Sequence, residues 1–161
     1  MEMSENGKKF IESFEGLFLK AYKCQAGVWT IGYGTTTYPV GVSVNKGDTC
    51  TEKQADAWMQ DELEDKGKKL DEMLSRVNFN PTQNEFDALL SFIYNLGEGM
   101  LDPARTIGTL IRSGNKKAVA DSMLLYCKYK GIFGIMRTSK GLLNRRKAEQ
   151  ALFLKPDEKI S

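Results

Sequence analysis

The amino-acid sequence predicts an α+β fold that is mostly helical. Strand-like patterns are confined to the first third of the chain, where residues 17–37 combine β-branched and aromatic residues with several glycines. Helical patterns cover most of the remainder, including a long amphipathic segment after residue 50 and a nearly all-apolar segment after residue 82. We therefore expect a small lobe with a β-hairpin and a larger helical lobe.

The first third of the chain is expected to run from a helix into a hairpin. Phe10, Ile11 and Phe14 fall at helical spacing and predict a short helix that stops at Gly16. A hairpin sheet follows over residues 17–37. Residues 35–47 are rich in glycine, proline and threonine, which predicts a loop with room for one further strand.

A long helix is predicted to connect the two lobes. Thr51 and Gln54 form a capping-box pattern, and apolar residues recur on one helical face over residues 51–74. Gly67 is expected to weaken the middle of this helix.

The larger lobe is expected to be built around one buried helix. Thr82 and Glu85 form a second capping box, and residues 82–96 are apolar on nearly every side, which is typical of a helix at the centre of a helical domain. Shorter helices are predicted around it, over residues 107–112, 116–126 and 140–154.

Composition narrows the chemistry that is available. The chain has 161 residues, no histidine and three cysteines, which fits one domain and excludes His-based triads. The lack of CxxC spacing and of histidine argues against a zinc site. The odd number of cysteines predicts free thiols at Cys24, Cys50 and Cys127. We expect no metal and no cofactor. Acid–base chemistry must then come from Asp, Glu, Cys, Tyr, Lys or Arg.

Charge and hydropathy bear on partners and location. Residues 1–100 carry 10 basic and 16 acidic side chains, a net of −6, and residues 101–161 carry 13 and 5, a net of +8. The basic part suits an anionic polymer, or it is simply a solvated helical surface. We expect no secretory signal and no stable membrane insertion, because the apolar runs are short and interrupted.

Three chemically able side chains follow one another in the first third. Glu15 stands where a helix ends and a hairpin begins, and Cys24 and Thr30 lie further along the same segment. A hairpin can fold Cys24 and Thr30 back toward the helix end, which would place a carboxyl, a thiol and a hydroxyl around one cleft. Each residue alone is ordinary at such a position.

The wider pattern closely resembles the phage lysozymes of glycoside hydrolase family 24. That family carries a Glu, eight residues, an Asp or sometimes a Cys, five residues, and a Thr, and this chain matches the spacing without a gap. The resemblance covers roughly residues 8–154. It rests on the segments Glu15-Gly16-Leu17, Ala21–Cys24, Gly27–Gly34, Thr82–Leu89, Asn95-Leu96-Gly97 and Gly141–Arg146 with Glu149.

The resemblance implies a lysozyme-like fold and a muramidase activity. It implies a single catalytic domain over residues 1–161, with about 13–60 as the β-containing lobe and 1–12 with 61–161 as the helical lobe. It also implies hydrolysis of the β-1,4 bond between N-acetylmuramic acid and N-acetylglucosamine in bacterial peptidoglycan, leading to lysis of the host cell.

Roles for individual residues follow from the same resemblance. Glu15 would be the general acid, Cys24 would occupy the usual Asp position, and Thr30 would position the attacking water. Tyr94, Asn95 and Arg145 match residues that line the family's cleft or reach the catalytic Glu, so we expect them to contact substrate. For Tyr94, plain core packing is an equally good interpretation.

Two departures from the family stand out. Cys24 replaces a carboxylate with a thiol, so it must have a lowered pKa, contribute less electrostatically, or act as a nucleophile, which would change the outcome from inversion to retention. Thr35 stands where the family usually has His, which we expect to affect a structural pair in the lobe more than the activity.

A lytic transglycosylase acting on the same bond and a catalytically weak wall-binding protein are the competing functions. The expected partner is peptidoglycan, with no nucleic acid, and we expect a monomer. The resemblance implies accumulation in the host cytoplasm, followed by release to the periplasm and cell wall through a holin that need not touch this chain.

Overall fold

The computed structural model describes residues 1–130 and 135–157, and the chain divides into two compact units. Lys8–Asp65 form the smaller unit, and Met1–Gly7 with Lys66–Ser161 form the larger one. The sequence placed the corresponding lobe limits at about 13 and 60. Both boundaries fall inside helices, α1 (Glu5–Glu15) and α2 (Glu52–Arg76), so no turn or linker in the sequence marks them.

The smaller unit is organised by a hairpin of β1 (Phe18–Lys23) and β2 (Trp29–Gly32), which pair antiparallel. A bulge lies between Phe18 and Tyr22 in this pairing. Ala21, Ile31 and Val44 form the apolar core beneath the hairpin. Because successive strand residues point to opposite faces, this core takes one face of the hairpin and leaves the other for polar groups.

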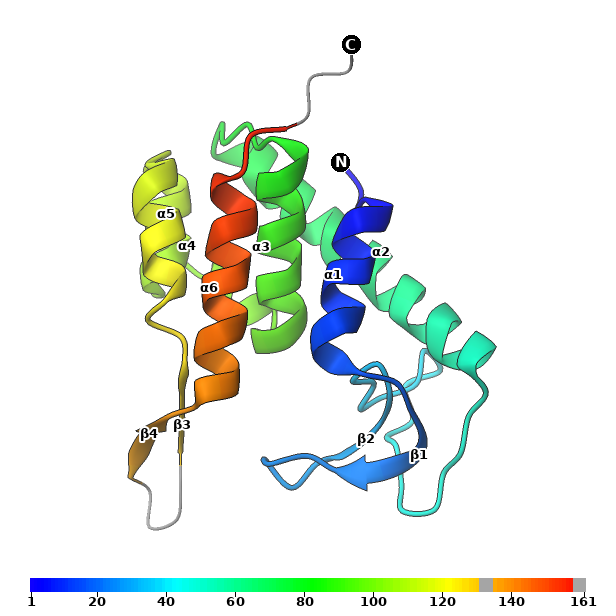
Figure 1. Ribbon diagram of the computed structural model, residues 1–161. Helices are drawn as coiled ribbons and strands as arrows, with labels where there is room; N and C mark the ends of the chain where they lie inside the picture. The colour runs from blue at the N-terminus through cyan, green and yellow to red at the C-terminus, as the bar shows by residue number, and fades with distance from the viewer. Residues whose placement is uncertain (131–134, 158–161) are drawn as a thin grey trace. The chain divides into compact units, whose positions relative to one another are not determined.

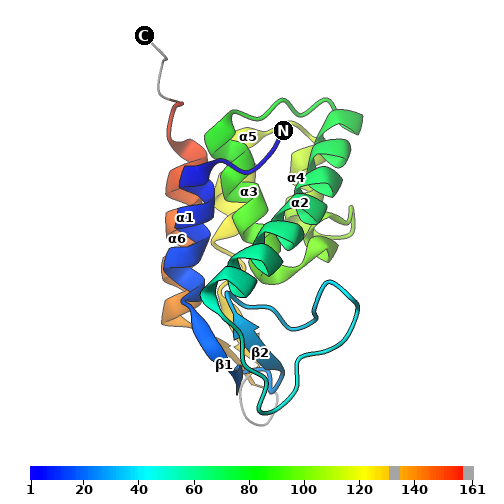
Figure 2. The same cartoon turned by 90° about the vertical axis from the view of Figure 1, so that its right-hand side faces the viewer.

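The segment between β2 and α2 is an extended irregular loop (Figure 2). Isolated bridges join Thr37 to Ser43 and Lys20 to Thr49, in place of the further strand for which the sequence left room. The backbone of Leu19 and Ala21 bonds to Cys50 and Asp48, which attaches the end of the loop to the free edge of β1. The loop is therefore tied to the hairpin at its edge.

The capping box predicted at the start of α2 is confirmed. The Gln54 amide donates to Thr51 Oγ1 at 3.2 Å, and the Thr51 amide donates to Gln54 Oε1 at 2.9 Å. The helix is continuous through Gly67, which is buried. A Cβ at this position would lie 3.5 Å from the side chain of Leu90, so glycine marks a place where α2 passes close to α3.

The larger unit is built around α3 (Gln83–Leu96), as the sequence predicted. The Thr82–Glu85 capping box is complete, and residues 85–94 are buried. α6 (Lys140–Leu154) packs along α3, and α5 (Lys116–Met123) packs on α6 (Figure 1). α4 (Thr106–Arg112) lies against α5, and the short 3-10 helix η1 (Glu98–Leu101) follows α3. The predicted class, α+β and mostly helical, is confirmed.

One element of this unit contradicts the sequence analysis. Strands were expected only in the first third, yet β3 (Lys128–Lys130) pairs antiparallel with β4 (Met136–Thr138). Every residue of these two strands is exposed. Each strand has only three residues and no buried face. That length is too short for the alternation of apolar and polar residues that identifies a half-buried strand.

Candidate active site

Glu15 is the last residue of α1. Gly16 follows with φ of 68°, a left-handed conformation that glycine adopts without strain and that ends the helix. The Gly16 amide still bonds to the Glu12 carbonyl at 3.1 Å. Glu15 is therefore held at a fixed helix end, half-buried, immediately before β1.

The hairpin brings Cys24 and Thr30 together. Tyr22 pairs with Thr30 across the strands, and the Cys24 amide extends the ladder by donating to the Val28 carbonyl at 3.0 Å. The turn closes where the Gly27 amide donates to the Cys24 carbonyl at 2.8 Å. Since residues two apart in a strand share a face, Tyr22, Cys24 and Thr30 lie on one face of the hairpin.

The surroundings of Cys24 favour a thiolate. Desolvation is the largest single influence and raises its pKa, but hydrogen bonds outweigh it and the net effect is a pKa below the ordinary thiol value. The donors are backbone N–H groups of Val28, Ala26 and Cys24 itself, together with the Thr30 hydroxyl. Hydrogen bonds made to the charged form of a group stabilise that form, so the thiolate of Cys24 forms more readily than that of an ordinary cysteine.

Thr30 has two acceptors within reach of its single proton. The residue is buried, and its hydroxyl lies 3.1 Å from the Val28 carbonyl oxygen while also bonding to Cys24. When the hydroxyl donates to either acceptor, its oxygen lone pairs stay available to accept from another group. Thr30 is thus equipped to support a thiolate and to orient a water molecule.

Tyr22 is a site residue that the sequence analysis missed. Desolvation raises the pKa of its phenol, and the negative charges of Glu15 and Cys24 raise it further. The phenol is therefore near both groups, and its ring lies 4.4 Å from that of Phe18, centroid to centroid. The spacing of Tyr22 and Cys24, two apart in a strand, was the available signal.

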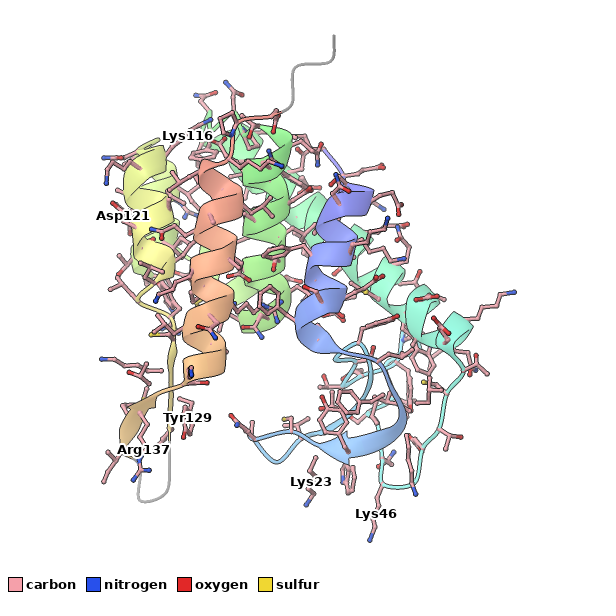
Figure 3. The ribbon with its side chains drawn as sticks, in the orientation of Figure 1. Lys23, Lys46, Lys116, Asp121, Tyr129 and Arg137 are labelled. Carbon is pink, nitrogen blue, oxygen red and sulfur yellow. The ribbon has the colours of Figure 1, made fainter. Side chains whose placement is uncertain are left out.

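The opposite face of the hairpin is separate from this group. The Lys23 ammonium lies 5.5 Å from the centre of the Trp29 ring, and these two residues are cross-strand partners. Figure 3 shows Lys23 directed away from the rest of the smaller unit. The polar site therefore uses only the face that carries Cys24.

Tyr94, Asn95 and Arg145, the expected substrate contacts, lie in the larger unit. Asn95 and Arg145 belong to one buried ionic cluster. Arg145 Nε donates to Glu149 Oε1 at 3.1 Å, and Arg146 Nε lies 2.6 Å from Glu149 Oε2. Arg146 also donates to Asn95 Oδ1 at 3.0 Å. Tyr94, next along α3, is buried. The arginines therefore hold the end of α3 against α6.

Glu149 is expected to be essential for stability. Burial raises the pKa of its carboxyl, which the Arg146 and Arg145 guanidinium groups oppose, and Ser91 Oγ donates to it at 2.8 Å. Glu149→Gln leaves two buried guanidinium groups without a countercharge, so we expect unfolding free energy to fall by about 3–5 kcal/mol. Thermal unfolding followed by circular dichroism measures the loss, which corresponds to a drop in Tm of roughly 10 °C.

The matched control for Glu149 is an exposed pair on α2. Glu72 and Arg76 lie 3.6 Å apart with 68% and 79% of their side chains exposed. Glu72→Gln should change the unfolding free energy by less than about 0.5 kcal/mol. Equal Tm values for the two variants would show that the buried cluster contributes nothing.

Thr35, which stands where the family usually has His, is a buried residue whose hydroxyl is unpaired within the part of the chain that the structure describes. The residue is 3% exposed, and among the described residues its Oγ1 has no hydrogen-bond partner. Thr35→Val removes that unpaired hydroxyl at nearly constant volume, so we expect a gain of about 1 kcal/mol in unfolding free energy. Urea denaturation measures it, with Thr36→Val, an exposed neighbour, as the control. A lower unfolding free energy for Thr35→Val would contradict the conclusion that the Thr35 hydroxyl is unpaired.

Two hollows in the smaller unit lie around Trp58. One of about 370 Å³ is lined by Thr35, Thr36, Thr37, Pro39, Trp58, Asp61, Glu62 and Asp65. The other, of about 580 Å³, is lined by Tyr38, Pro39, Val40, Asp48, Thr49, Gln54, Ala57, Trp58 and Asp61. Neither hollow is lined by Glu15, Cys24 or Thr30.

The family model for phage lysozyme matches residues 12–149. The chain belongs to the phage lysozyme family. It is a glycoside hydrolase of the lysozyme type, and the family's function is that of endolysins and muramidases. The predicted resemblance is confirmed, because the matched range includes all of the residues on which the expected roles were placed.

Relatives agree with this assignment over most of the chain. An endolysin of Acyrthosiphon pisum secondary endosymbiont phage 1 is 35% identical over 156 residues, 95% of this chain and 98% of the relative. The endolysin of Salmonella phage P22 is 34% identical over 154 residues, 96% and 99% of the two chains. The chain spans only about half the length of the endolysin of Bacillus phage B103, with 34% identity and 56% of that protein covered.

Solved structures show the same fold. The endolysin from Escherichia coli O157:H7 phage FAHEc1 matches with a TM-score of 0.76 and 36% identity, covering 96% of this chain and 94% of that one. The muramidase domain of SpmX from Asticaccaulis excentricus matches with a TM-score of 0.81 and 30% identity, covering 96% and 99%. The lysozyme-like fold predicted from the sequence is therefore confirmed.

No group of three or more His, Cys, Asp or Glu side chains is suited to hold a metal ion within residues 1–130 and 135–157. In the same part of the chain, no helix has both the length and the apolar character needed to cross a bilayer. The thiols of Cys24, Cys50 and Cys127 are free.

Proposed function

We propose that the chain is an endolysin that hydrolyses the β-1,4 bond between N-acetylmuramic acid and N-acetylglucosamine in bacterial peptidoglycan. The observation that carries the proposal is the hydrogen-bond environment of Cys24. Backbone N–H groups and the Thr30 hydroxyl lower the pKa of a thiol that stands where the family usually has a carboxylate. A residue with that environment can do the work of the missing Asp.

Glu15 serves as the general acid in this proposal. Its proton passes to the glycosidic oxygen as the bond from that oxygen to C1 breaks, and the electron pair leaves with the oxygen. The half-buried position at the end of α1, immediately before the hairpin that carries Cys24 and Thr30, supports the role.

Cys24 and Thr30 handle the water. The Thr30 hydroxyl orients a water molecule. The oxygen of that water bonds to C1, and the proton that the water loses passes to the Cys24 thiolate. Cys24 thereby replaces the usual Asp as the base, and water attack from the face opposite the leaving group gives inversion. A lowered pKa supports this role better than that of an inert thiol.

The substrate contacts and the cellular setting belong to the same proposal. In this proposal Tyr94, Asn95 and Arg145 contact the glycan, on the ground of their match to the family's motifs; internal bonds fix Asn95 and Arg145 in the cluster around Glu149. The enzyme acts as a monomer, accumulates in the host cytoplasm, and reaches the wall once a holin permeabilises the membrane. The names of its phage relatives support this setting.

Product analysis tests the reaction. Purified sacculi are digested in water enriched in oxygen-18, and the products are examined by mass spectrometry and by NMR of the anomeric protons. Hydrolysis with inversion places one labelled oxygen at C1 and gives the α-anomer first. Unlabelled anhydro-muramic ends would identify a lytic transglycosylase, and initial β-anomer would identify Cys24 as a nucleophile.

The pH dependence is expected to follow Cys24. Because the proposed step needs protonated Glu15 and the Cys24 thiolate at the same time, kcat/KM should pass through a maximum with pH. One limb of that profile should follow the pKa of Cys24, which lies below the usual thiol value. Thr30→Val removes one of the hydrogen bonds that lower this pKa, so that limb should move to higher pH. Cys24→Asp should move it toward the acid range, since carboxyl groups titrate about four units lower. Identical profiles for all three proteins would contradict the role.

A further inference from the structure

The β3–β4 hairpin is a surface that the proposed hydrolysis does not use. Lys128, Lys130 and Met136 lie on its strands, with Lys130 paired to Met136 and Tyr129 paired to Arg137. All six strand positions are exposed, so neither face of the hairpin is covered by the described residues. The hairpin extends past the first turn of α6, away from the helices of its own unit (Figure 1), and Figure 3 shows Tyr129 and Arg137 on it.

The charge of this region has one sign. Between Asp121 and Glu149 the sequence contains no acidic residue, while it contains seven basic ones. Four of those lie on the hairpin or at its end, namely Lys128, Lys130, Arg137 and Lys140. None of the four has an ion-pair partner among the described residues. A positive patch of this kind attracts a negatively charged surface.

Apolar side chains lie among these cations. Ile135 is 57% exposed, Met136 is 58% exposed and Tyr129 is 37% exposed. Exposed aliphatic side chains gain free energy when they leave water for the apolar edge of a bilayer, a gain that a hydrated phosphate backbone does not offer. Tyrosine favours the same boundary, because its ring is apolar and its hydroxyl reaches water.

We propose that the β3–β4 hairpin binds the surface of an anionic phospholipid bilayer. The lysines and arginine approach the phosphate headgroups, while Met136, Ile135 and Tyr129 enter the boundary between headgroups and acyl chains. This is peripheral adsorption at a surface and not insertion across the membrane. It would concentrate the enzyme at the surface of the host's membrane.

Vesicle co-sedimentation of the full chain tests the proposal. The vesicles are phosphatidylcholine alone, or phosphatidylcholine with 30% phosphatidylglycerol, each at low salt and at 0.5 M NaCl. The wild type should partition onto the phosphatidylglycerol vesicles at low salt and much less onto the neutral vesicles. Each basic residue near an anionic leaflet contributes about a fivefold factor, so the variant Lys128→Glu/Lys130→Glu/Arg137→Glu should lose at least roughly 100-fold in partition coefficient.

A matched variant separates this surface from net charge. Lys46→Glu/Lys53→Glu/Lys68→Glu alters three exposed lysines elsewhere and gives the same formal charge change, from +2 to −4. It should keep partitioning within about fivefold of the wild type. Met136→Ser should lower the partition coefficient by a similar factor at low salt and at 0.5 M NaCl, because it removes an apolar contact and no charge.

Several results would overturn the proposal. They are equal binding of the wild type to neutral and anionic vesicles, no binding to either, or equal losses in the two charge variants. A loss of adsorption to purified sacculi that exceeds the loss on vesicles would assign the hairpin to the glycan instead. Hydrolysis of solubilised peptidoglycan by each variant reports on fold and chemistry separately, so failure here leaves the proposed function unaffected.

Discussion

Glu15→Gln is expected to reduce kcat/KM on peptidoglycan by about 1,000-fold or more. The amide has the size and shape of the carboxyl group but no acidic proton to give to the glycosidic oxygen, and general acid catalysis contributes about 10²–10⁴-fold. Because Glu15 is the final residue of α1 and Gly16 ends the helix, the substitution should leave the local backbone unchanged. Release of soluble muropeptides from sacculi measures the rate.

The control for this prediction lies on the same helix. Glu5 is exposed in the first turn of α1, ten residues before Glu15 in the sequence. Glu5→Gln should keep activity within about twofold and lose only the small stabilisation that an acidic residue gives to a helix start, about 0.3–1 kcal/mol. If Glu15→Gln keeps more than a tenth of wild-type activity while Tm is unchanged, another group supplies the proton.

Cys24→Ala is expected to reduce kcat/KM by about 100-fold or more, whereas Cys24→Asp should stay within about tenfold of the wild type. Alanine removes the base that takes the proton from water, a contribution of about 10²–10⁴-fold. Aspartate restores a carboxylate at a position where backbone N–H groups and Thr30 already stabilise negative charge. The same assay on sacculi compares the three proteins.

Cys50 provides the matched control for the thiol. It is half-buried like Cys24, but burial raises its pKa and its sulfur lies 3.9 Å from the Phe18 carbonyl oxygen, outside the set of Glu15, Cys24 and Thr30. Cys50→Ala should retain full activity. An alkylating reagent should then inactivate Cys50→Ala as fast as the wild type. A fully active Cys24→Ala enzyme would leave Glu15 as the sole catalytic residue.

Local signals determined the helices of this protein. The Thr82–Glu85 box fixes the start of α3 because both of its bonds join residues three apart in the sequence. Gly16 fixes the end of α1 for an equally local reason, its left-handed backbone conformation. Helix ends of this kind can be predicted from a single sequence, because the interacting groups are neighbours along the chain.

The β3–β4 hairpin and the limits of the two units had no such signal. Both strands have only exposed positions, so no burial pattern shaped their sequences. The division of the chain falls within α1 and α2, where helical periodicity continues across the boundary. Which residues gather into one unit depends on contacts between distant segments, and a helix that belongs to both units hides the boundary.

Some features of the candidate site could likewise be predicted from the sequence, and others depended on the tertiary structure. The sequence alone determined the family and the spacing of Glu15, Cys24 and Thr30, since these depend on order along the chain. The tertiary structure decided that Cys24 sits among hydrogen-bond donors and that Tyr22 lies near it. The pKa of the Cys24 thiol depends on the groups that surround it. The pairing of the hairpin strands brings those groups together.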